Sequence, residues 1–405
     1  MGTWIRRSIA GIAVGVLAVA TAVTGAVTAS ALPVYPASDP DPFFTAPPDV
    51  ANHQPGDVLK IRKMPPNLYF PGSEVWELLF RTTDSQGKPI AANTTFLKPP
   101  NHQPNSPLVS YQHIINALGH KCKIATELYT TDPLTQIREA PGLNIALARG
   151  WAVALPDHLG PRMAYGAAKL GGQITLDGIR AIQRTPELQV TDSPVGLGGY
   201  SGGGMATSWA AALAPTYAPE LNIVGAAEGG APMNLGKMAT ALGTNPHPAF
   251  GLAMAAALGL EREYPERMNV TDQLNDTGRW LLSMIGNGCT NEIMFWGLGR
   301  SANEMTDNRN FLDDPVAWQV MDENSLELYP GIPKTPIFEW HSPTDTLVPV
   351  DAIENTMRRY CDAGVPVQTL LTPSPDHLSA AVLGLPQALD WLDARFRGVP
   401  APSTC

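Results

Sequence analysis

The spacing of hydrophobic and polar positions divides this chain near residue 108. Before that point, β-branched and aromatic residues alternate with polar ones over 58–63, 75–83 and 90–98, and this alternation predicts antiparallel strands. The turn residues Ser-Gln-Gly-Lys at 85–88 connect the second strand to the third. We therefore expect a β-hairpin at the edge of a larger sheet.

After residue 108 the pattern changes to short apolar runs that alternate with helical stretches. These segments follow one another at 108–111, 143–148, 152–155, 174–183, 195–199 and 223–227 and, later, at 337–341, 350–363, 367–371 and 377–396. Alternation of this kind is typical of a parallel sheet whose strands are connected by crossover helices. The expected fold is of the α/β class.

The stretch between the strands expected at 223–227 and 337–341 carries no clear strand pattern. Instead it shows helical patterns at 235–242, 249–260 and 280–285. We interpret residues 233–328 as a helical cap, or lid, inserted into a core formed by residues 32–232 and 329–405. Its apolar side chains would line a site for acyl chains or form the cap's own core, and the sequence leaves both open. They are Leu235, Met238, Leu242, Phe250, Leu252, Met254, Leu258 and Leu260.

Residues 1–31 have the features of an export signal that is removed from the mature protein. Arg6 and Arg7 precede the apolar stretch Ile9–Val27, and the small residues Ala-Ser-Ala at 29–31 match a cleavage site. No later segment supplies the roughly 18 consecutive apolar residues of a membrane-spanning helix. We expect a secreted protein without a stable membrane anchor.

Composition narrows the classes of partner and cofactor. Apolar residues make up 44% of the chain, enough for a sizeable core, and the formal net charge of −10 disfavours nucleic acid as a partner. None of the four cysteines, Cys122, Cys289, Cys361 and Cys405, forms a CxxC pair, so the spacing of a metal site is absent. Two disulfides are expected after export. Of the three pairings available we favour Cys122 with Cys289 and Cys361 with Cys405, because the second bond would tether the Pro-rich C-terminal end.

The segment Gly199-Tyr200-Ser201-Gly202-Gly203 fits the pattern G-x-S-x-G and lies between an apolar strand and a helical run. In this setting the serine occupies a strained turn that exposes its hydroxyl, and glycines on both sides let the neighbouring backbone approach closely. The helix that follows directs partial positive charge toward a developing oxyanion. We predict that Ser201 is a nucleophile, whereas outside such a setting the pattern is often only a loop.

A serine hydroxyl needs a base within hydrogen-bond reach and a third group that orients the base. His377 is the only histidine after His341, and it follows the strand expected at 367–371. Because the chain order in hydrolases of this kind is serine, acid, histidine, His377 is the predicted base. The ordinary alternative is a structural histidine at the start of a helix.

Asp345 is the predicted acid because it follows the strand expected at 337–341, at the sheet edge where ligand sites gather. Three other acids compete with it. Asp351 is more consistent with capping the next helix, Glu339 lies inside the strand, and Asp376 is too close to His377 along a tight loop to reach its ring nitrogen.

The oxyanion hole is expected to use the backbone N–H of Gly202 and a donor from the loop at 110–117. Asn116 is the candidate in that loop, through its backbone or its side chain, although it would also suit an ordinary turn. His113 and His120 are interpreted as surface or loop histidines rather than metal ligands. Asp157, near the expected entrance, would support the site rather than react.

These residues resemble the secretory lipase family of the Candida antarctica lipase A type, and in particular its actinobacterial triacylglycerol lipases. The resemblance rests on Ser110-Tyr111-Gln112 with its loop, on 156–161, on 199–203, on the helical insertion and on 341–349. It implies an α/β-hydrolase fold, hydrolysis of acylglycerols, a cap over the site, no metal or organic cofactor, and the disulfide pairing favoured above. The fungal prototype of the family has an acidic residue where this chain places Asn116.

The sequence therefore predicts a secreted serine hydrolase that cleaves esters, most consistent with a triacylglycerol lipase acting through an acyl-enzyme on Ser201. Its partners would be lipid or ester substrates, with transient binding at lipid–water interfaces. The alternatives are a short-chain esterase, a peptidase or an acyltransferase on the same scaffold, because a triad does not name its substrate. An inactive hydrolase-fold protein that binds at a surface is the alternative from another class.

Overall fold

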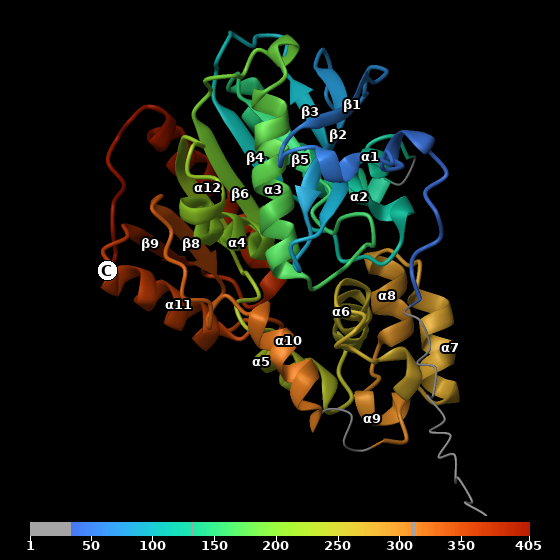
Figure 1. Ribbon diagram of the computed structural model, residues 1–405. Coiled ribbons are helices and arrows are strands. Elements are labelled where there is room, and N and C mark those ends of the chain that lie inside the picture. The colour runs from blue at the N-terminus through green and yellow to red at the C-terminus, as the bar shows by residue number, and fades with distance from the viewer. Residues whose placement is uncertain (1–33, 131–132, 309–312) are drawn as a thin grey trace, which may run out of the picture. The chain divides into compact units, whose positions relative to one another are not determined.

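The computed structural model describes residues 34–130, 133–308 and 313–405, with only the backbone given for 133–139 (Figure 1). The export signal expected at 1–31 lies outside the described residues.

The described residues form one nine-stranded sheet in the order β1-β2-β3-β5-β4-β6-β7-β8-β9. The strands are β1 Val58–Lys63, β2 Glu74–Thr83, β3 Pro89–Lys98, β4 Leu108–Gln112, β5 Ala152–Pro156, β6 Val195–Tyr200, β7 Ile223–Gly229, β8 Ile337–His341 and β9 Val367–Leu371. The strands β1 to β3 pair antiparallel at one edge, β3 joins β5 antiparallel, and the remaining neighbours are parallel. The expected α/β fold with its edge hairpin is confirmed.

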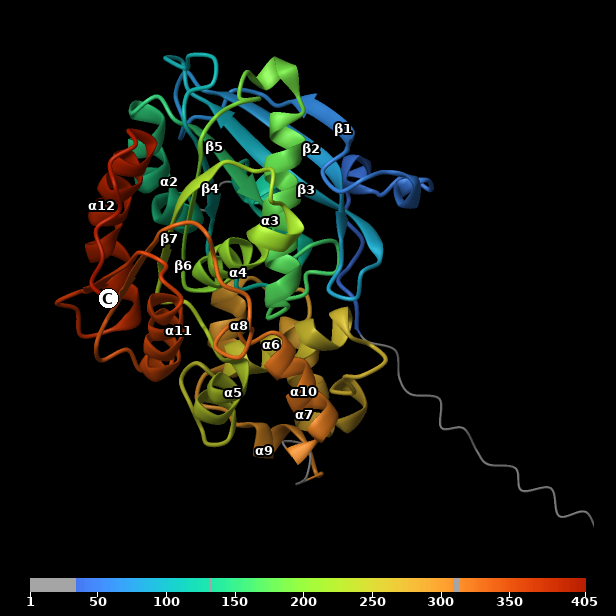
Figure 2. The ribbon, with the colours of Figure 1, turned by 60° about the vertical axis from the view of Figure 1, so that its left-hand side comes forward.

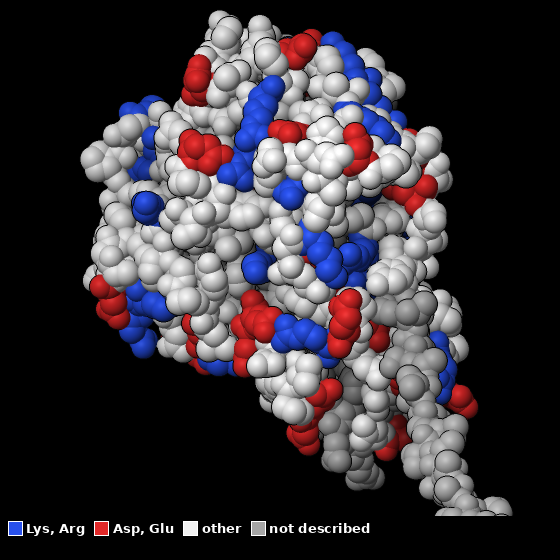
Figure 3. All heavy atoms as spheres, viewed as in Figure 1, with Lys and Arg blue, Asp and Glu red and all other residues white. Residues whose placement is uncertain are grey.

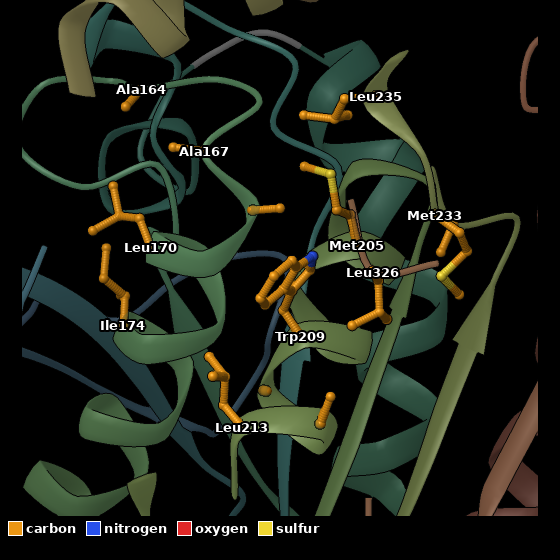
Figure 4. Packing of buried hydrophobic residues seen from close by; sticks show 14 of the residues in the cluster. Ala164, Ala167, Leu170, Ile174, Met205, Trp209, Leu213, Met233, Leu235 and Leu326 are labelled. Atoms are coloured by element: carbon orange, nitrogen blue, oxygen red, sulfur yellow. The ribbon is translucent and has the colours of Figure 1, made fainter. Parts of the chain in front are cut away.

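Helices cover both faces of this sheet. One face packs against α3 (Ala168–Gln183), α4 (Gly202–Tyr217) and α11 (Val350–Asp362), and the other against α2 (Pro133–Ala148) and α12 (His377–Phe396). Figure 4 shows apolar side chains of α3 and α4 facing one another around the buried indole of Trp209. The burial of such a large aromatic side chain favours close packing of the two helices onto the sheet.

Helices fill the stretch between β7 and β8, and its described residues form no named strand. They are α5 Leu235–Gly243, α6 Phe250–Glu263, α7 Asp276–Ile285, α8 Thr290–Gly297, α9 Ala302–Met305 and α10 Pro315–Glu323. They gather beyond the start of α4 in both ribbon views (Figures 1 and 2). The sequence pattern anticipated helices at α5 to α7 but not at α8 to α10. The remaining short helices are η1 Pro42–Phe44, η2 Val50–Asn52, η3 His120–Cys122, α1 Ile124–Glu127, η4 Pro186–Leu188 and η5 Thr271–Gln273.

Two disulfides join Cys122 to Cys289 and Cys361 to Cys405, the pairing favoured from the sequence. They close loops of 167 and 44 residues, and a cross-link between distant residues stabilises a fold by restricting its unfolded chain. Among the described residues, no helix is long and apolar enough to cross a membrane. The face in Figure 3 carries interspersed acidic and basic side chains rather than a field of one sign.

Candidate active site

Ser201 lies at the junction of β6 and α4, as the N-cap of the helix. Its backbone has φ +55° and ψ −122°, a conformation that is unfavourable for a residue with a Cβ and that is typical of functional turns. The N–H of Ser201 donates to the carbonyl oxygen of Gly229 on β7 over 2.8 Å, which helps to hold this turn at the end of the sheet. The side chain is largely buried, with 8% of the residue exposed.

The glycines on either side of the turn are required by close backbone contacts. A Cβ on Gly199 would lie 2.5 Å from the carbonyl oxygen of Gly203, and a Cβ on Gly203 would overlap the carbonyl oxygen of Gln112 on β4. Such distances are too short for a carbon atom. The first turn of α4 therefore packs directly against the end of β4, and only glycine at these two positions permits that approach.

His377 is the first residue of α12 and is brought to Ser201 from 176 positions later in the chain. Its Nε2 lies 2.8 Å from the Ser201 hydroxyl. Asp376 caps the helix by accepting from the N–H groups of Leu378 and Ser379, so the direction in which the histidine leaves the loop is fixed locally.

Asp345 lies in the loop that follows β8, and its Oδ2 is 2.6 Å from Nδ1 of His377. Its Oδ1 accepts hydrogen bonds from the N–H groups of Leu347 and Val348 over 2.8 and 3.0 Å. Burial opposes ionisation, but the bond to His377 and these two backbone bonds hold the pKa of Asp345 below its usual value. The structure thus brings Ser201, His377 and Asp345 into one continuous chain of hydrogen bonds.

The three competing acids have other partners. Glu339 is buried in β8 and bonds to His341, and Asp376 caps α12. The expectation that Asp351 caps a helix is wrong. The helix α11 begins at Val350, so Asp351 lies within its first turn and instead pairs with Lys237 over 2.6 Å.

Gly202 and Asn116 lie side by side at the nucleophile. Gly202 is the first residue of α4, where a backbone N–H has no acceptor within the helix. Asn116 is 8% exposed, and its Oδ1 would be 2.9 Å from a Cβ on Gly202. This Oδ1 has no hydrogen-bond partner among the described residues. A half-turn about the last side-chain torsion exchanges oxygen and nitrogen of the amide, so a donor can occupy the same position.

Among the described residues, no group of three or more His, Cys, Asp or Glu side chains could hold a metal ion. His113 lies in the predicted loop but not at the surface: it is fully buried, because the loop is covered by α4 and by His158. Nε2 of His158 lies 2.9 Å from the carbonyl oxygen of His113, and burial lowers the pKa of His158 to about 4. A neutral His158 therefore donates to this carbonyl. His120 lies near Asp39.

Asp157 supports this region, as expected. It accepts hydrogen bonds from the N–H of Ile124 and from the side chain of Asn93, and it is almost completely buried. Burial raises the pKa of Asp157 to about 6, although Lys123 and both hydrogen bonds oppose that shift.

An apolar cavity of about 90 Å³ starts at Gly202 and runs between α4 and the helices α5 and α6. Of the eight apolar residues singled out in the sequence, Leu235, Met238, Leu242, Leu252 and Leu260 line it. A second cavity, of about 110 Å³, shares five lining residues with the first cavity. Its lining also includes Phe250 and Met254. Leu258 lines neither cavity and is part of the packed core. Seven of these eight side chains therefore line apolar cavities, and the eighth, Leu258, is packed in the core.

Tyr200 has a contact that the sequence pattern could not indicate. Its hydroxyl donates to the carbonyl oxygen of His377 over 2.6 Å, and the two rings lie 5.0 Å apart. Tyr200 thereby holds the backbone of His377, the residue whose ring contacts Ser201.

The family model for "Secretory lipase" matches residues 130–404. The chain belongs to the secretory lipase family. It is 32% identical to Lipase 6 of Candida albicans over 386 residues, which cover 90% of this chain and 83% of that protein. It is 30% identical to the probable trichothecene esterase SAT6 of Stachybotrys chartarum, covering 88% of this chain and 76% of that protein.

Among solved structures, Candida antarctica lipase A in its closed state superposes with a TM-score of 0.84 at 28% identity, covering 90% of this chain and 88% of that one. The fold of this secretory lipase is thus the α/β-hydrolase fold, and its membership makes it a lipase or esterase. The resemblance to the secretory lipase family seen in the sequence is confirmed.

Proposed function

We propose that this secretory lipase hydrolyses esters through an acyl-enzyme on Ser201. The observation that carries the proposal is the continuous chain from Ser201 Oγ to His377 over 2.8 Å and from His377 to Asp345 over 2.6 Å. Nε2 of His377 takes the serine proton as Oγ attacks the ester carbonyl carbon, and then delivers it to the leaving alcohol. Water, activated by the same nitrogen, releases the acid. Asp345 orients the imidazole and stabilises its charged form.

The oxyanion of the tetrahedral intermediate would be stabilised by the N–H of Gly202 and by Asn116. Donors fixed in advance near a developing negative charge act without the reorganisation that water requires. The buried position of Asn116 beside Gly202 supports this role. Since the Asn116 side chain is uncharged, it can donate to the oxyanion without first having to be protonated.

The substrates proposed are acylglycerols. The cavity that starts at Gly202 is lined almost entirely by aliphatic, methionine and aromatic side chains and continues toward a second apolar cavity in the cap. Such a lining suits an acyl chain. Residues 233–328 would form the cap over this site, with residues 32–232 and 329–405 as the two parts of the core.

Secretion and transient contact with a lipid–water interface complete the proposal. The two disulfides and the features of residues 1–31 support export. Leu378 and Val382 are each 71% exposed and lie on α12 directly after His377, where uncharged side chains would favour approach to an ester surface.

Covalent labelling tests the proposal at the nucleophile. A fluorophosphonate should modify the wild-type chain at one residue, which peptide mass spectrometry should identify as Ser201. Ser208→Ala is the matched control, because Ser208 is a buried serine on the same helix whose hydroxyl donates to the carbonyl oxygen of Gly204 and interacts with Glu228 rather than with His377. Labelling should persist in this control and disappear in Ser201→Ala. Labelling of folded Ser201→Ala at the wild-type rate would contradict the proposal.

A further inference from the structure

Three consecutive charged residues at the end of α6 are buried. Glu261, Arg262 and Glu263 are 2%, 1% and 1% exposed, although charged side chains are rarely buried without specific partners. Each glutamate accepts a hydrogen bond from a backbone N–H. Glu261 accepts from Val270, nine residues later in the chain, and Glu263 accepts from Ser85 in the turn between β2 and β3. The middle residue, Arg262, points toward the oxyanion side of the site.

Every hydrogen bond that the structure gives Arg262 within the described chain ends on a main-chain carbonyl oxygen. Nη1 donates to Leu118 over 2.8 Å and, at 3.3 and 3.2 Å, to Arg162 and Met163. Nη2 donates to Gly286 over 2.7 Å, and Nε to Val34 over 2.8 Å. One planar guanidinium thus connects four separate segments, and its fork of donors is what makes this geometry available.

The charge of Arg262 is retained at this buried position. Burial lowers the pKa of Arg262 to about 10, which still leaves the group charged at neutral pH. The negative charge of the neighbouring Glu261 favours the cationic form, and the carbonyl dipoles bind the guanidinium directly.

The oxyanion loop rests on the connection between α7 and α8 of the cap. Leu118 accepts from Arg262 and also donates its N–H to the carbonyl oxygen of Gly288 over 3.0 Å. The hydroxyl of Thr290 donates to the carbonyl oxygen of Asn116 over 3.2 Å. A Cβ on Gly119 would overlap the carbonyl oxygen of Asn287, so the two segments touch along their backbones.

The disulfide between Cys122 and Cys289 closes this contact covalently, three residues after Gly119 and at the N-cap of α8. By contrast, the disulfide between Cys361 and Cys405 joins α11 to the C-terminal end. The loop that carries Asn116 is therefore held by a buried cation of the cap and by a cross-link between Cys122, which follows the loop, and Cys289 of the cap.

We propose that Arg262, together with the Cys122–Cys289 disulfide, positions the oxyanion loop, so that the cap completes the catalytic site as well as covering it. Arg262 is then a positioning residue that acts through Leu118 on Asn116. This inference rests on the proposed function, because it assigns Asn116 to the oxyanion hole.

The kinetic signature of such a role is a fall in kcat with little change in KM. Oxyanion donors interact with negative charge that develops only in the transition state. Displacing a donor therefore reduces the stabilisation of the transition state more than the binding of the ester. Loss of one such donor typically lowers kcat by about 10²- to 10³-fold. A shifted donor should cost at least about tenfold.

Arg262→Lys and Arg262→Met test the proposal on p-nitrophenyl butyrate, with Arg359→Met as the matched control. Arg359 also holds backbone carbonyls, those of Leu326 and Gly331, but on α11 away from the oxyanion loop. We expect kcat to fall at least about tenfold in Arg262→Met with KM within about twofold. Arg262→Lys should recover part of kcat because it keeps the charge and one donor direction, and Arg359→Met should keep kcat.

A second pair of variants covers the case in which Arg262→Met does not fold. Cys122→Ser with Cys289→Ser removes the cross-link of the loop, and Cys361→Ser with Cys405→Ser removes the other disulfide. The first pair should lower kcat at unchanged KM, whereas the second should lower thermal stability without this loss of kcat.

The outcomes separate this inference from the proposed function. If Ser201→Ala keeps wild-type turnover, the proposed function fails. If Ser201→Ala is inactive but folded Arg262→Met keeps the kcat of Arg359→Met, the positioning role is overturned while the proposed function stands. Where Arg262→Met does not fold, an unchanged kcat in the Cys122/Cys289 variant overturns it instead. A loss confined to KM would also overturn it.

Discussion

Two imidazole–carboxylate pairs lie at the end of β8, and in the described chain only one of them reaches a serine hydroxyl. His377 contacts Asp345 over 2.6 Å, and His341 contacts both oxygens of Glu339 over 2.9 Å. In both pairs Nδ1 faces the carboxylate. The other ring nitrogen differs: Nε2 of His377 faces the Ser201 hydroxyl, whereas Nε2 of His341 is buried and has no hydrogen-bond partner in the described chain. A histidine–carboxylate pair becomes a catalytic device only when its second nitrogen reaches a nucleophile.

The carboxylates of the two pairs also differ in electrostatics. Asp345 receives two backbone N–H bonds besides its histidine, and its pKa lies below the usual value despite burial. Burial raises the pKa of Glu339, and the bond to His341 offsets this only in part. The bond to His377 and, to a smaller extent, the two backbone donors thus keep the carboxylate of Asp345 ionised, as an orienting acid requires.

The largest expected difference follows from removing each imidazole. His377→Ala should lower kcat on esters by about 10⁶, because in the part of the chain that the structure describes only His377 hydrogen-bonds to the Ser201 hydroxyl. His341→Gln should leave kcat nearly unchanged and reduce thermal stability, because it removes a buried partner of Glu339. Steady-state kinetics and thermal unfolding of both variants measure this. Comparable kcat losses in two folded variants would erase the distinction between the pairs.

Replacing each carboxylate by its amide gives the next effect. Asp345→Asn should lower kcat by about 10⁴, since an amide favours the wrong tautomer of His377. Glu339→Gln preserves the shape of the second pair and should change kcat little. The measurement compares kcat of the two amide variants, and near-ultraviolet circular dichroism verifies that both are folded. An Asp345→Asn variant with wild-type kcat would count against Asp345 as the orienting acid.

A buried carboxyl group beside the second pair should make the stability of the fold depend on pH. Glu228 on β7 is next to Glu339 in the sheet register, and burial raises the pKa of Glu228 from 4.5 to about 8. Between these values the folded chain keeps a proton that the unfolded chain releases, so the free energy of unfolding decreases as the pH rises. The free energy of unfolding of Glu228→Gln, relative to that of the wild type, should therefore rise by roughly 2 to 4 kcal/mol between pH 5 and pH 8. Urea unfolding at the two pH values measures this, and a difference independent of pH would refute it.

The smallest effect is expected at Asp376, next to the catalytic pair but outside it. Asp376→Ala removes the cap of α12 and should lower the melting temperature slightly, with kcat reduced much less than in Asp345→Asn. Differential scanning fluorimetry and ester kinetics test this. A kcat loss as large as that of Asp345→Asn would show that the acid had been assigned to the wrong residue.

The strands and the turn at Ser201 could be predicted because their signals are local. Alternating residues in β1 to β3 and apolar runs in β4 to β9 show which faces are buried, and G-x-S-x-G marks a turn that few other residues permit. Asp345 and His377 were placed by chain order and by strand ends, without knowledge of any contact.

What the sequence could not indicate depends on distant partners. The helix α8 begins at a disulfide-bonded cysteine, and the carbonyl acceptors of Arg262 leave no trace in side-chain pattern. The helix α11 begins earlier than the cap predicted at Asp351 requires, so that Asp351 lies in its first turn and pairs with Lys237 from α5. One signal was present: Asp314 followed by Pro315 is a common helix start, and α10 begins there.

The central claim is that Ser201, served by the His377–Asp345 pair, cleaves esters. The most direct measurement is the hydrolysis of p-nitrophenyl esters with acyl chains from two to sixteen carbons by the wild-type chain and by Ser201→Ala. The account predicts turnover by the wild type, extending to long chains, and its loss with Ser201. A folded wild-type chain that is silent on every ester, or a Ser201→Ala variant that is equally active, would contradict it.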